Sequence, residues 1–185
     1  MNLRTGTGAL VAAAVLALSY VVAASVPAAS QNSDPTNKLS VWAGTWNYHA
    51  ETYETAYGHA NAYDGTGKCN WSPNHGFMVC DYLNHNPKAG APLNDITVFT
   101  YDARTKTYSQ VSVFKDSKPF TRHMTVAGNT WISSTEIPYK GKTVIYRDVY
   151  VFQSSDKRTT TTQISADNGK TWTIVTKFTA EQTAA

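Results

Sequence analysis

Residues 39–49 read LSVWAGTWNYH and combine three features of the start of a β-structure. Leu39, Val41 and Trp42 form a short apolar turn. Gly44 then lets the chain turn sharply, because it has no Cβ atom to clash with the backbone. A strand begins directly after this glycine. Trp46 on this strand can then pack beneath the segment that covers it. The stretch therefore predicts a short apolar plug followed by a run of strands.

The remainder of the chain alternates between segments that favour strands and short polar turns. Trp, Tyr, Phe and Thr are abundant, and no segment shows sustained helical periodicity. Strands are predicted at residues 44–50, 77–84, 96–101, 107–114, 120–126, 130–137, 143–153, 159–165 and 171–178. A further strand is expected within residues 56–70, with an interruption at Asp64-Gly65 as the alternative to a continuous strand. Because consecutive hairpins favour a meander and closure removes exposed edges, we expect an all-β protein, an antiparallel up-and-down β-barrel of about ten strands.

The opening motif and two later motifs resemble a known group of proteins. Gly44-Thr45-Trp46 is similar to the Gly-x-Trp opening of lipocalins and the wider calycin superfamily. The chain also resembles an uncharacterised family of secreted bacterial lipocalin-like domains of unknown function. These domains carry a Tyr-Asp-x-x-Thr-Lys-x-Tyr hairpin, here Tyr101 to Tyr108, and a Tyr-Arg strand, here Tyr146-Arg147. The resemblance covers residues 39–178 and implies a barrel whose interior binds a ligand.

One feature of lipocalins has no direct counterpart in this sequence. Lipocalins usually place an arginine from a late strand across the Trp of the opening motif. No arginine follows Arg158 here. The resemblance therefore implies that Arg147, Arg158 or Lys177 occupies that position.

The first 30 residues have the pattern of a secretory signal peptide. Arg4 supplies a positive charge, residues 9–24 are apolar, and small residues offer cleavage points after Ala28 or Ser30. The alternative is a membrane anchor, but the apolar run is short for a bilayer, which needs about 20 residues. We expect a secreted or periplasmic protein with a cleaved signal (1–30), a disordered leader (31–37) and one barrel domain (38–180).

Charge and cysteine content limit the partners and the redox state. The formal net charge is +3, and it falls by one without Arg4, so neither nucleic acid nor a membrane surface is an expected partner.

Cys69 and Cys80 flank the turn-rich segment 72–76, which predicts a hairpin that brings them together. In an oxidising compartment we expect a disulfide. Two free buried thiols or a two-cysteine metal site are the alternatives.

Residues 165–172 read SADNGKTW and match the Asp-box motif, Ser-x-Asp-x-Gly-x-Thr-Trp. Asp167 is expected to accept backbone N–H groups, Gly169 to adopt a positive φ, and Trp172 to pack beneath the turn. In sialidase-like propellers this box repeats in several blades and is not catalytic. We therefore assign it a structural role in a hairpin, as we do for Gly44 and Trp46.

Aromatic residues are the main candidates for lining the barrel. Alternation places Tyr146 and Tyr150 on one face of a strand and Arg147 on the other. The pattern leaves open which face is inside, and an inward Arg147 would suit a ligand carboxylate. The predicted ligand-binding residues are Tyr48, Trp71, Tyr101, Tyr108, Trp131, Tyr146 and Arg147.

No motif in the sequence assigns an enzymatic activity. A Gly-x-Ser-x-Gly elbow and a phosphate-binding loop are both missing, and the histidines lack the spacing of a metal site. We hypothesise that the barrel binds a small, mostly apolar or aromatic molecule, without a cofactor or metal. The alternatives are an enzyme that acts on a lipophilic or aromatic molecule with His and Tyr as acid and base, an interaction module of the cell envelope, or a haem- or metal-binding barrel using His49, His59, His85 or His123.

Overall fold

A 3₁₀ helix and ten strands make up this computed structural model, which describes residues 34–85, 94–114 and 118–183. The helix is η1 (Pro35–Trp42). The strands are β1 (Gly44–Thr52), β2 (Asn61–Trp71), β3 (Phe77–Asn84), β4 (Asn94–Asp102), β5 (Thr107–Phe114), β6 (Phe120–Ala127), β7 (Thr130–Tyr139), β8 (Lys142–Phe152), β9 (Lys157–Ser165) and β10 (Thr173–Gln182). The predicted signal peptide lies outside the described residues. No helix within the described residues has the length and hydrophobicity of a membrane span.

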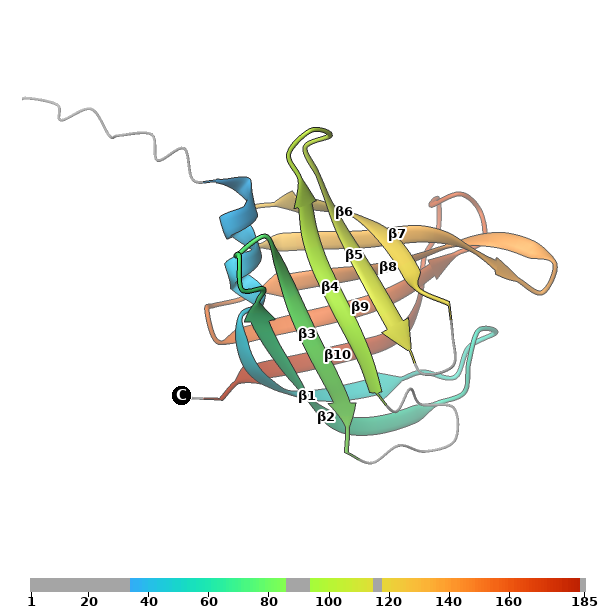
Figure 1. The fold of residues 1–185 in the computed structure, drawn as a ribbon. Coiled ribbons are helices and arrows are strands. Elements are labelled where there is room, and N and C mark those ends of the chain that lie inside the picture. The colour runs from blue at the N-terminus through green and yellow to red at the C-terminus, as the bar shows by residue number, and fades with distance from the viewer. Residues whose placement is uncertain (1–33, 86–93, 115–117, 184–185) are drawn as a thin grey trace, which may run out of the picture. The chain divides into compact units, whose positions relative to one another are not determined.

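Each strand pairs with the next in antiparallel register, and β10 returns to pair with β1 (Figure 1). This closure confirms the predicted ten-stranded, up-and-down barrel. Within the region 56–70, β2 begins at Asn61 and continues to Trp71 without an interruption at Asp64-Gly65. The Glu54 carboxylate accepts the backbone N–H of Ala60 at 3.0 Å. This contact holds the connection before Asn61 in a turn, so the strand starts after it.

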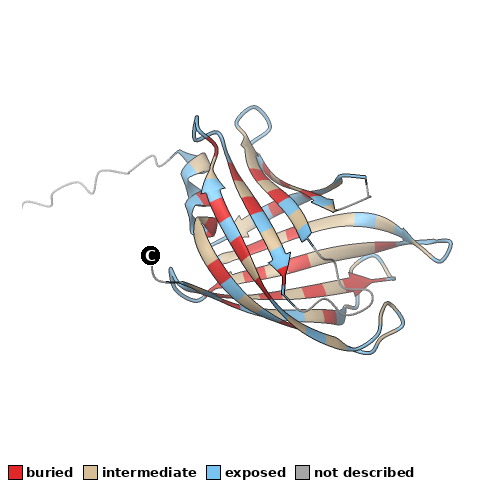
Figure 2. Ribbon diagram, turned by 60° about the horizontal axis from the view of Figure 1, so that its bottom comes forward, coloured by how far each residue is buried: buried red, intermediate tan, exposed pale blue. Residues whose placement is uncertain are grey.

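Buried residues alternate with more exposed residues along the strands (Figure 2), as expected when successive side chains point to opposite faces of a sheet. On β4, Phe99 is 1% exposed whereas Ile96 is 48% exposed. The structure thus settles which apolar face of this strand is internal. The sequence could not, because both faces of β4 carry apolar residues.

The η1 helix plugs one end of the barrel with aromatic packing. Leu39 and Trp42 are fully buried. The Trp42 ring stacks on Phe99 with 4.2 Å between centroids and meets Tyr150 edge-on at 4.7 Å. The indole Nε1–H of Trp46 donates to the Trp42 carbonyl oxygen at 2.9 Å, which ties the plug to β1.

The helix begins earlier than the sequence analysis predicted. We expected a disordered leader through residue 37, but η1 starts at Pro35, and the Asp34 carboxylate accepts the backbone N–H of Thr36 at 2.9 Å. Asp34 followed by Pro35 is a helix-start signal, because an aspartate caps free N–H groups and proline suits the first helical position. Residues 35–37 therefore belong to the plug.

Arg158 on β9 closes the same end from the interior. Its guanidinium carbon lies 4.8 Å from the ring centroid of Trp42 and 4.6 Å from that of Trp46. Of Arg147, Arg158 and Lys177, Arg158 is therefore the residue that lies across Trp46, the tryptophan of the opening motif. Arg147 lies on the outside, stacked on Trp172 at 3.4 Å from its ring centroid.

Two local features agree with the turn and cysteine patterns. Cys69 and Cys80 are direct partners across β2 and β3 and form the predicted disulfide. In the Asp-box turn, Asp167 accepts both the N–H and the hydroxyl of Thr171, at 2.9 and 2.6 Å. These bonds lower the pKa of Asp167 to about 2. Gly169 has a φ of 82°, and its carbonyl oxygen accepts the Trp172 indole N–H.

Candidate functional site

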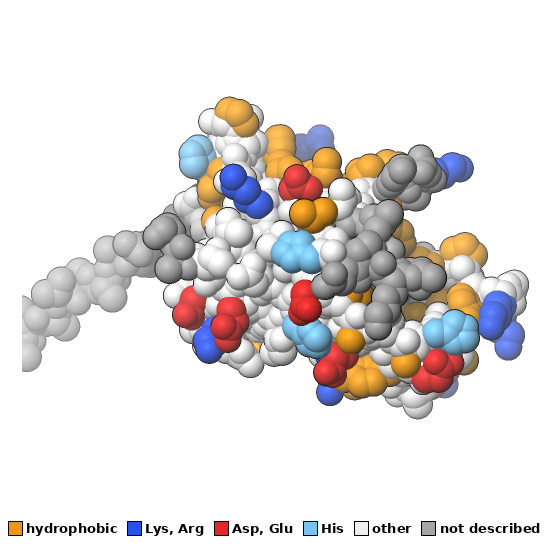
Figure 3. Space-filling model, turned by 90° about the horizontal axis from the view of Figure 1, so that it is seen from below, with side chains coloured by type: hydrophobic (Ala, Val, Ile, Leu, Met, Phe, Trp, Pro, Cys, Tyr) orange, Lys and Arg blue, Asp and Glu red, His pale blue; other side chains and the backbone are white. Residues whose placement is uncertain are grey.

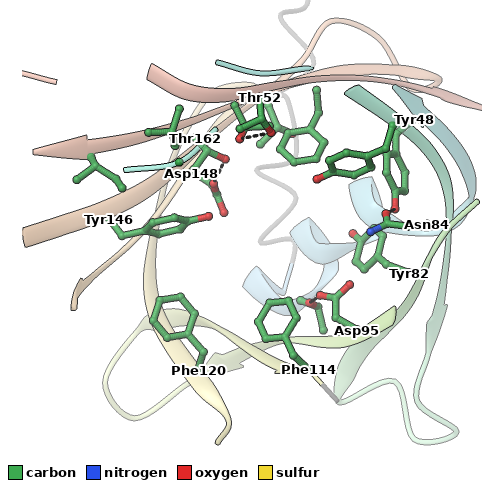
Figure 4. Close-up of a pocket in the computed structure, with 18 of the residues that line it drawn as sticks. Tyr48, Thr52, Tyr82, Asn84, Asp95, Phe114, Phe120, Tyr146, Asp148 and Thr162 are labelled. Carbon is green, nitrogen blue, oxygen red and sulfur yellow. Dashed lines mark hydrogen bonds between the residues drawn. The ribbon is translucent and has the colours of Figure 1, made fainter. Parts of the chain in front are cut away.

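The barrel encloses a cavity of about 1100 Å³ beyond the η1 plug, and all ten strands contribute side chains to it. Figure 4 shows these side chains around an open centre, with η1 behind them. The connection between β1 and β2 and the segment before β6 also line it, through Tyr57, His59 and Lys118. The cavity thus extends from the plug to the opposite end of the barrel.

Aromatic rings form much of the wall, and two glycines on β2 make room for them. A Cβ at Gly65 would lie 2.2 Å from the Tyr48 hydroxyl oxygen, and one at Gly67 would lie 2.5 Å from the Tyr82 ring. A glycine in a strand often marks such a close approach. The Tyr48 hydroxyl donates to Asn84 Oδ1 at 2.6 Å, which fixes its ring. The aromatic lining residues are Tyr48, Tyr57, Tyr63, Tyr82, Phe114, Phe120, Tyr146, Tyr150 and Phe178.

A buried ion pair connects β6 and β8 inside the barrel. Arg122 donates to Asp148, and both side chains are less than 10% exposed. Asp148 also accepts the Thr162 hydroxyl at 2.6 Å and lies 3.2 Å from the Tyr150 hydroxyl. Burial alone would lower the pKa of Arg122, but the charge of Asp148 raises it overall. Arg122 therefore stays charged, and the hydrogen bonds of the pair are largely made within the protein.

A row of hydroxyl groups leads from this ion pair to a second carboxylate. Arg122 Nη2 donates to Ser112 Oγ at 3.2 Å, and Ser112 Oγ lies 2.8 Å from Thr97 Oγ1. Thr97 Oγ1 then donates to Asp95 Oδ2 at 3.1 Å. The row crosses β6, β5 and β4, and it orients the Asp95 carboxylate toward the cavity centre (Figure 4).

Asp95 differs from Asp148 because its charge is poorly compensated. Burial raises the pKa of Asp95 to about 6, although the Thr97 hydrogen bond and the Arg122 charge act in the opposite direction. The pKa of Tyr63 is raised to about 12, first by burial and then by the Asp95 charge. Burial, Tyr63 and Asp95 also raise the pKa of Tyr48. The cavity therefore contains a carboxylate that is ionised only above about pH 6.

Comparison with known proteins identifies a family without an assigned function. Residues 32–180 match a family described as "protein of unknown function (DUF1579)". The chain belongs to this family. No match was found among curated proteins.

Two solved structures are similar to this DUF1579 barrel. The structure of Rv2717c from M. tuberculosis has a TM-score of 0.55 and 11% sequence identity, covering 82% of this chain and 99% of that chain. A protein of unknown function from the DUF3598 family of Nostoc punctiforme has a TM-score of 0.27 and 10% identity, covering 81% and 99%. At these identities the first structure supports the fold alone, and the second carries no argument.

The barrel brings two of the seven predicted ligand-binding residues into the cavity, Tyr48 and Tyr146. Tyr108 lies at the plug instead, where its hydroxyl donates to the Pro35 carbonyl oxygen at 2.7 Å. Trp131 meets the Trp42 ring edge-on with 6.2 Å between centroids.

The remaining three predicted residues also lie outside the cavity lining. Tyr101 packs against Tyr108 with 4.7 Å between centroids, and Trp71 lies 5.6 Å from the His75 ring. Arg147 faces outward, where its Nε donates to Gln163 Oε1 at 2.7 Å. Aromatic content alone did not distinguish the cavity from the plug, because both ends of the barrel interior are aromatic.

The polar residues of the cavity were not identified from the sequence. The alternation of side chains along a strand could have identified Asp148, because it places Asp148 on the same face as Tyr146 and Tyr150. The same reasoning places Asp95 on the face of Phe99 on β4. A charged residue in register with buried aromatic residues is a mark of a barrel interior.

The five histidines are exposed within the described residues, and His59 is the one among them that lines the cavity. His59 Nδ1 lies 3.0 Å from the exposed Glu54, and His49 Nδ1 lies 2.7 Å from Asp64 on the outside. Among the described residues, no group of three or more His, Cys, Asp or Glu side chains is placed to hold a metal ion. The described histidines therefore give no specific support to the haem, metal or His–Tyr enzyme hypotheses.

Charged side chains on the visible outer face in Figure 3 are mixed in sign and scattered. This distribution matches the small formal net charge of +3. The interior cavity is therefore the better-defined candidate site.

Proposed function

We propose that this protein binds a small, mostly apolar molecule inside the barrel. The observation that carries the proposal is the cavity of about 1100 Å³ with its aromatic wall. Small-molecule pockets typically measure about 300–1,000 Å³ and combine apolar walls with a few fixed polar groups. The Arg122–Asp148 pair and Asp95 supply such fixed groups here.

The test compares an apolar fluorescent probe, 1-N-phenylnaphthylamine, in the wild type and two tryptophan variants. Thr160 lines the cavity, whereas Thr161 on the same strand is not among the lining residues. Thr160→Trp fills part of the cavity, and Thr161→Trp is the matched control. We expect the probe to bind the wild type and T161W alike and T160W at least tenfold more weakly.

Circular dichroism and thermal unfolding establish that both variants are folded before they are compared. Equal probe affinity for T160W and T161W, or failure of the probe to bind the wild type, would contradict binding in the interior.

We also propose that the protein is exported and acts as a secreted or periplasmic carrier without nucleic-acid or membrane partners. The signal-like pattern of residues 1–30 supports this proposal, and the Cys69–Cys80 disulfide is compatible with an oxidising compartment. The mass of the protein recovered from the medium or periplasm tests it. Cleavage after Ala28 or Ser30 is the expected result, and an uncleaved chain retained in the cell would contradict it.

A further inference from the structure

Asp95 is a charged group of the cavity that has no ion-pair partner among the described residues. Its carboxylate accepts one hydrogen bond, from Thr97 at 3.1 Å, and no described cation lies within ion-pair distance of it. An ionised carboxylate in an apolar site is costly unless a cation or several hydrogen bonds accompany it. We therefore expect a bound ligand to supply the partner of Asp95.

The two buried arginines of the cavity are already engaged. Arg122 is paired with Asp148 and donates to Ser112. Arg158 lies over the rings of Trp42 and Trp46 at the plug. Arg122 Nε and Arg158 Nη1 have no hydrogen-bond partner among the described residues, so an anionic ligand would meet these two atoms. A cationic ligand would instead meet the Asp95 carboxylate, and the experiment below separates the two.

Aromatic side chains surround this carboxylate. Tyr82 and Phe114 are its direct partners across the strands, and all three side chains line the cavity. Figure 4 shows Asp95 between these two rings, with Tyr48 across the opening. A carboxylate beside aromatic rings is a combination that recognises ammonium groups, since the ring faces also attract cations.

We propose that Asp95 anchors the ammonium group of a cationic, otherwise apolar ligand, an amine whose hydrocarbon part fills the rest of the cavity. The inference rests on the proposed binding function and specifies the ligand class of the same site. Asp95 forms the ion pair, Thr97 holds the carboxylate in place, and the tyrosine and phenylalanine rings surround the cation.

The ion pair also makes binding depend on pH. The titratable or charged groups near Asp95 are Tyr48, Tyr63, Tyr82, Arg122 and the outward Asp81, and His59 and Lys118 line the same cavity. Because the pKa of Asp95 is about 6, its carboxyl group is protonated at pH 5. Amine binding is expected to weaken between pH 7.5 and pH 5, while binding of a neutral analogue stays constant.

The experiment uses three ligands that share one alkyl chain: decylamine, decanol and decanoate. Calorimetry at pH 7.5 compares the wild type with Asp95→Asn and with Asp81→Asn, the same substitution at an exposed position on β3. We expect decylamine to bind the wild type and D81N at least tenfold more tightly than decanol does. In D95N this preference disappears, because decylamine loses its ion pair and binds no more tightly than decanol does.

Three results would overturn the inference while leaving the proposed function intact. One is equal affinity of the wild type for the amine and the alcohol, and another is unchanged amine affinity in D95N. Tighter binding of decanoate than of decylamine would also overturn it, in favour of an anionic ligand. If neither the three ligands nor 1-N-phenylnaphthylamine binds, both the inference and the proposed function fail.

Discussion

At the scale of single residues, the cavity separates two carboxylates by their surroundings. Asp148 is paired with Arg122 and accepts the Thr162 hydroxyl, whereas Asp95 accepts one hydroxyl among the described residues, that of Thr97. The first is part of the internal framework of the barrel. The second retains capacity for a ligand.

This difference predicts that Asp95→Asn stabilises the unliganded protein at neutral pH. The folded-state pKa of about 6 lies above the ordinary value of 3.8, so the protonated form favours folding and this contribution is lost as the pH rises through 6. Because water in the cavity screens the charge, we expect a gain of about 1 kcal/mol at pH 7.5.

Urea denaturation at several pH values checks this prediction, with Asp81→Asn as the control. The gain should shrink as the pH falls through about 6 and vanish near the ordinary value of 3.8. A gain that does not change with pH would show that the ionisation of Asp95 is not its cause.

Arg158 gives a second prediction at this scale. The residue is 5% exposed, and its guanidinium lies over two indole rings. Arg158→Met retains most of the hydrophobic stem but removes the cation–π contacts, so we expect a loss of about 1–3 kcal/mol in unfolding free energy. Arg147→Met, on the outside, should cost less than about 1 kcal/mol. Equal losses in the two variants would show that the position over Trp46 has no special role.

At the scale of elements, β2 provides the space that two tyrosine rings occupy. A Cβ at Gly67 would meet the Tyr82 ring at 2.5 Å, whereas one at Gly58, in the preceding connection, would meet nothing within 4 Å. Gly67→Ala forces Tyr82 to move, and we expect a loss of about 1–3 kcal/mol. Gly58→Ala is the control and should change stability by less than about 0.5 kcal/mol.

Thermal unfolding of the two variants provides the measurement. Because Tyr82 lines the cavity, Gly67→Ala should also weaken binding of 1-N-phenylnaphthylamine. A variant with wild-type stability and wild-type probe affinity would contradict the packing described for β2.

Elements were the features that the sequence predicted best. Turn residues and strand-forming runs located all ten strands, and the turn between Cys69 and Cys80 predicted their pairing. The start of η1 was placed too late because the Asp34–Pro35 signal was not used. The start of β2 within the region 56–70 was not predicted, because the Glu54–Ala60 contact that precedes it joins residues that are not adjacent in the sequence.

The candidate site was harder to predict than the fold, for a physical reason. Which strand face is internal depends on closure of the whole barrel, and on β4 both faces carry apolar residues. Of the predicted ligand-binding residues, Tyr48 and Tyr146 line the interior cavity, whereas Tyr108 and Trp131 pack around the plug. The alignment of Arg122, Ser112, Thr97 and Asp95 arises from strand register, which single-strand patterns do not contain.

At the scale of the whole molecule, the interior of the closed barrel is divided into a packed end and a cavity. One end is filled by η1 and its aromatic contacts, which stabilise the fold. The rest of the interior holds the cavity and its polar network. A barrel that uses one end as a core can keep the other open to a ligand without exposing strand edges.

Native mass spectrometry of protein purified without refolding tests the central claim, that the interior holds a small molecule. The account predicts a complex of one ligand with the wild-type chain, either as purified or after incubation with excess decylamine or 1-N-phenylnaphthylamine. The extra mass should leave on denaturation and be absent from Thr160→Trp. A wild-type chain that stays at its own mass under all of these conditions would contradict the claim.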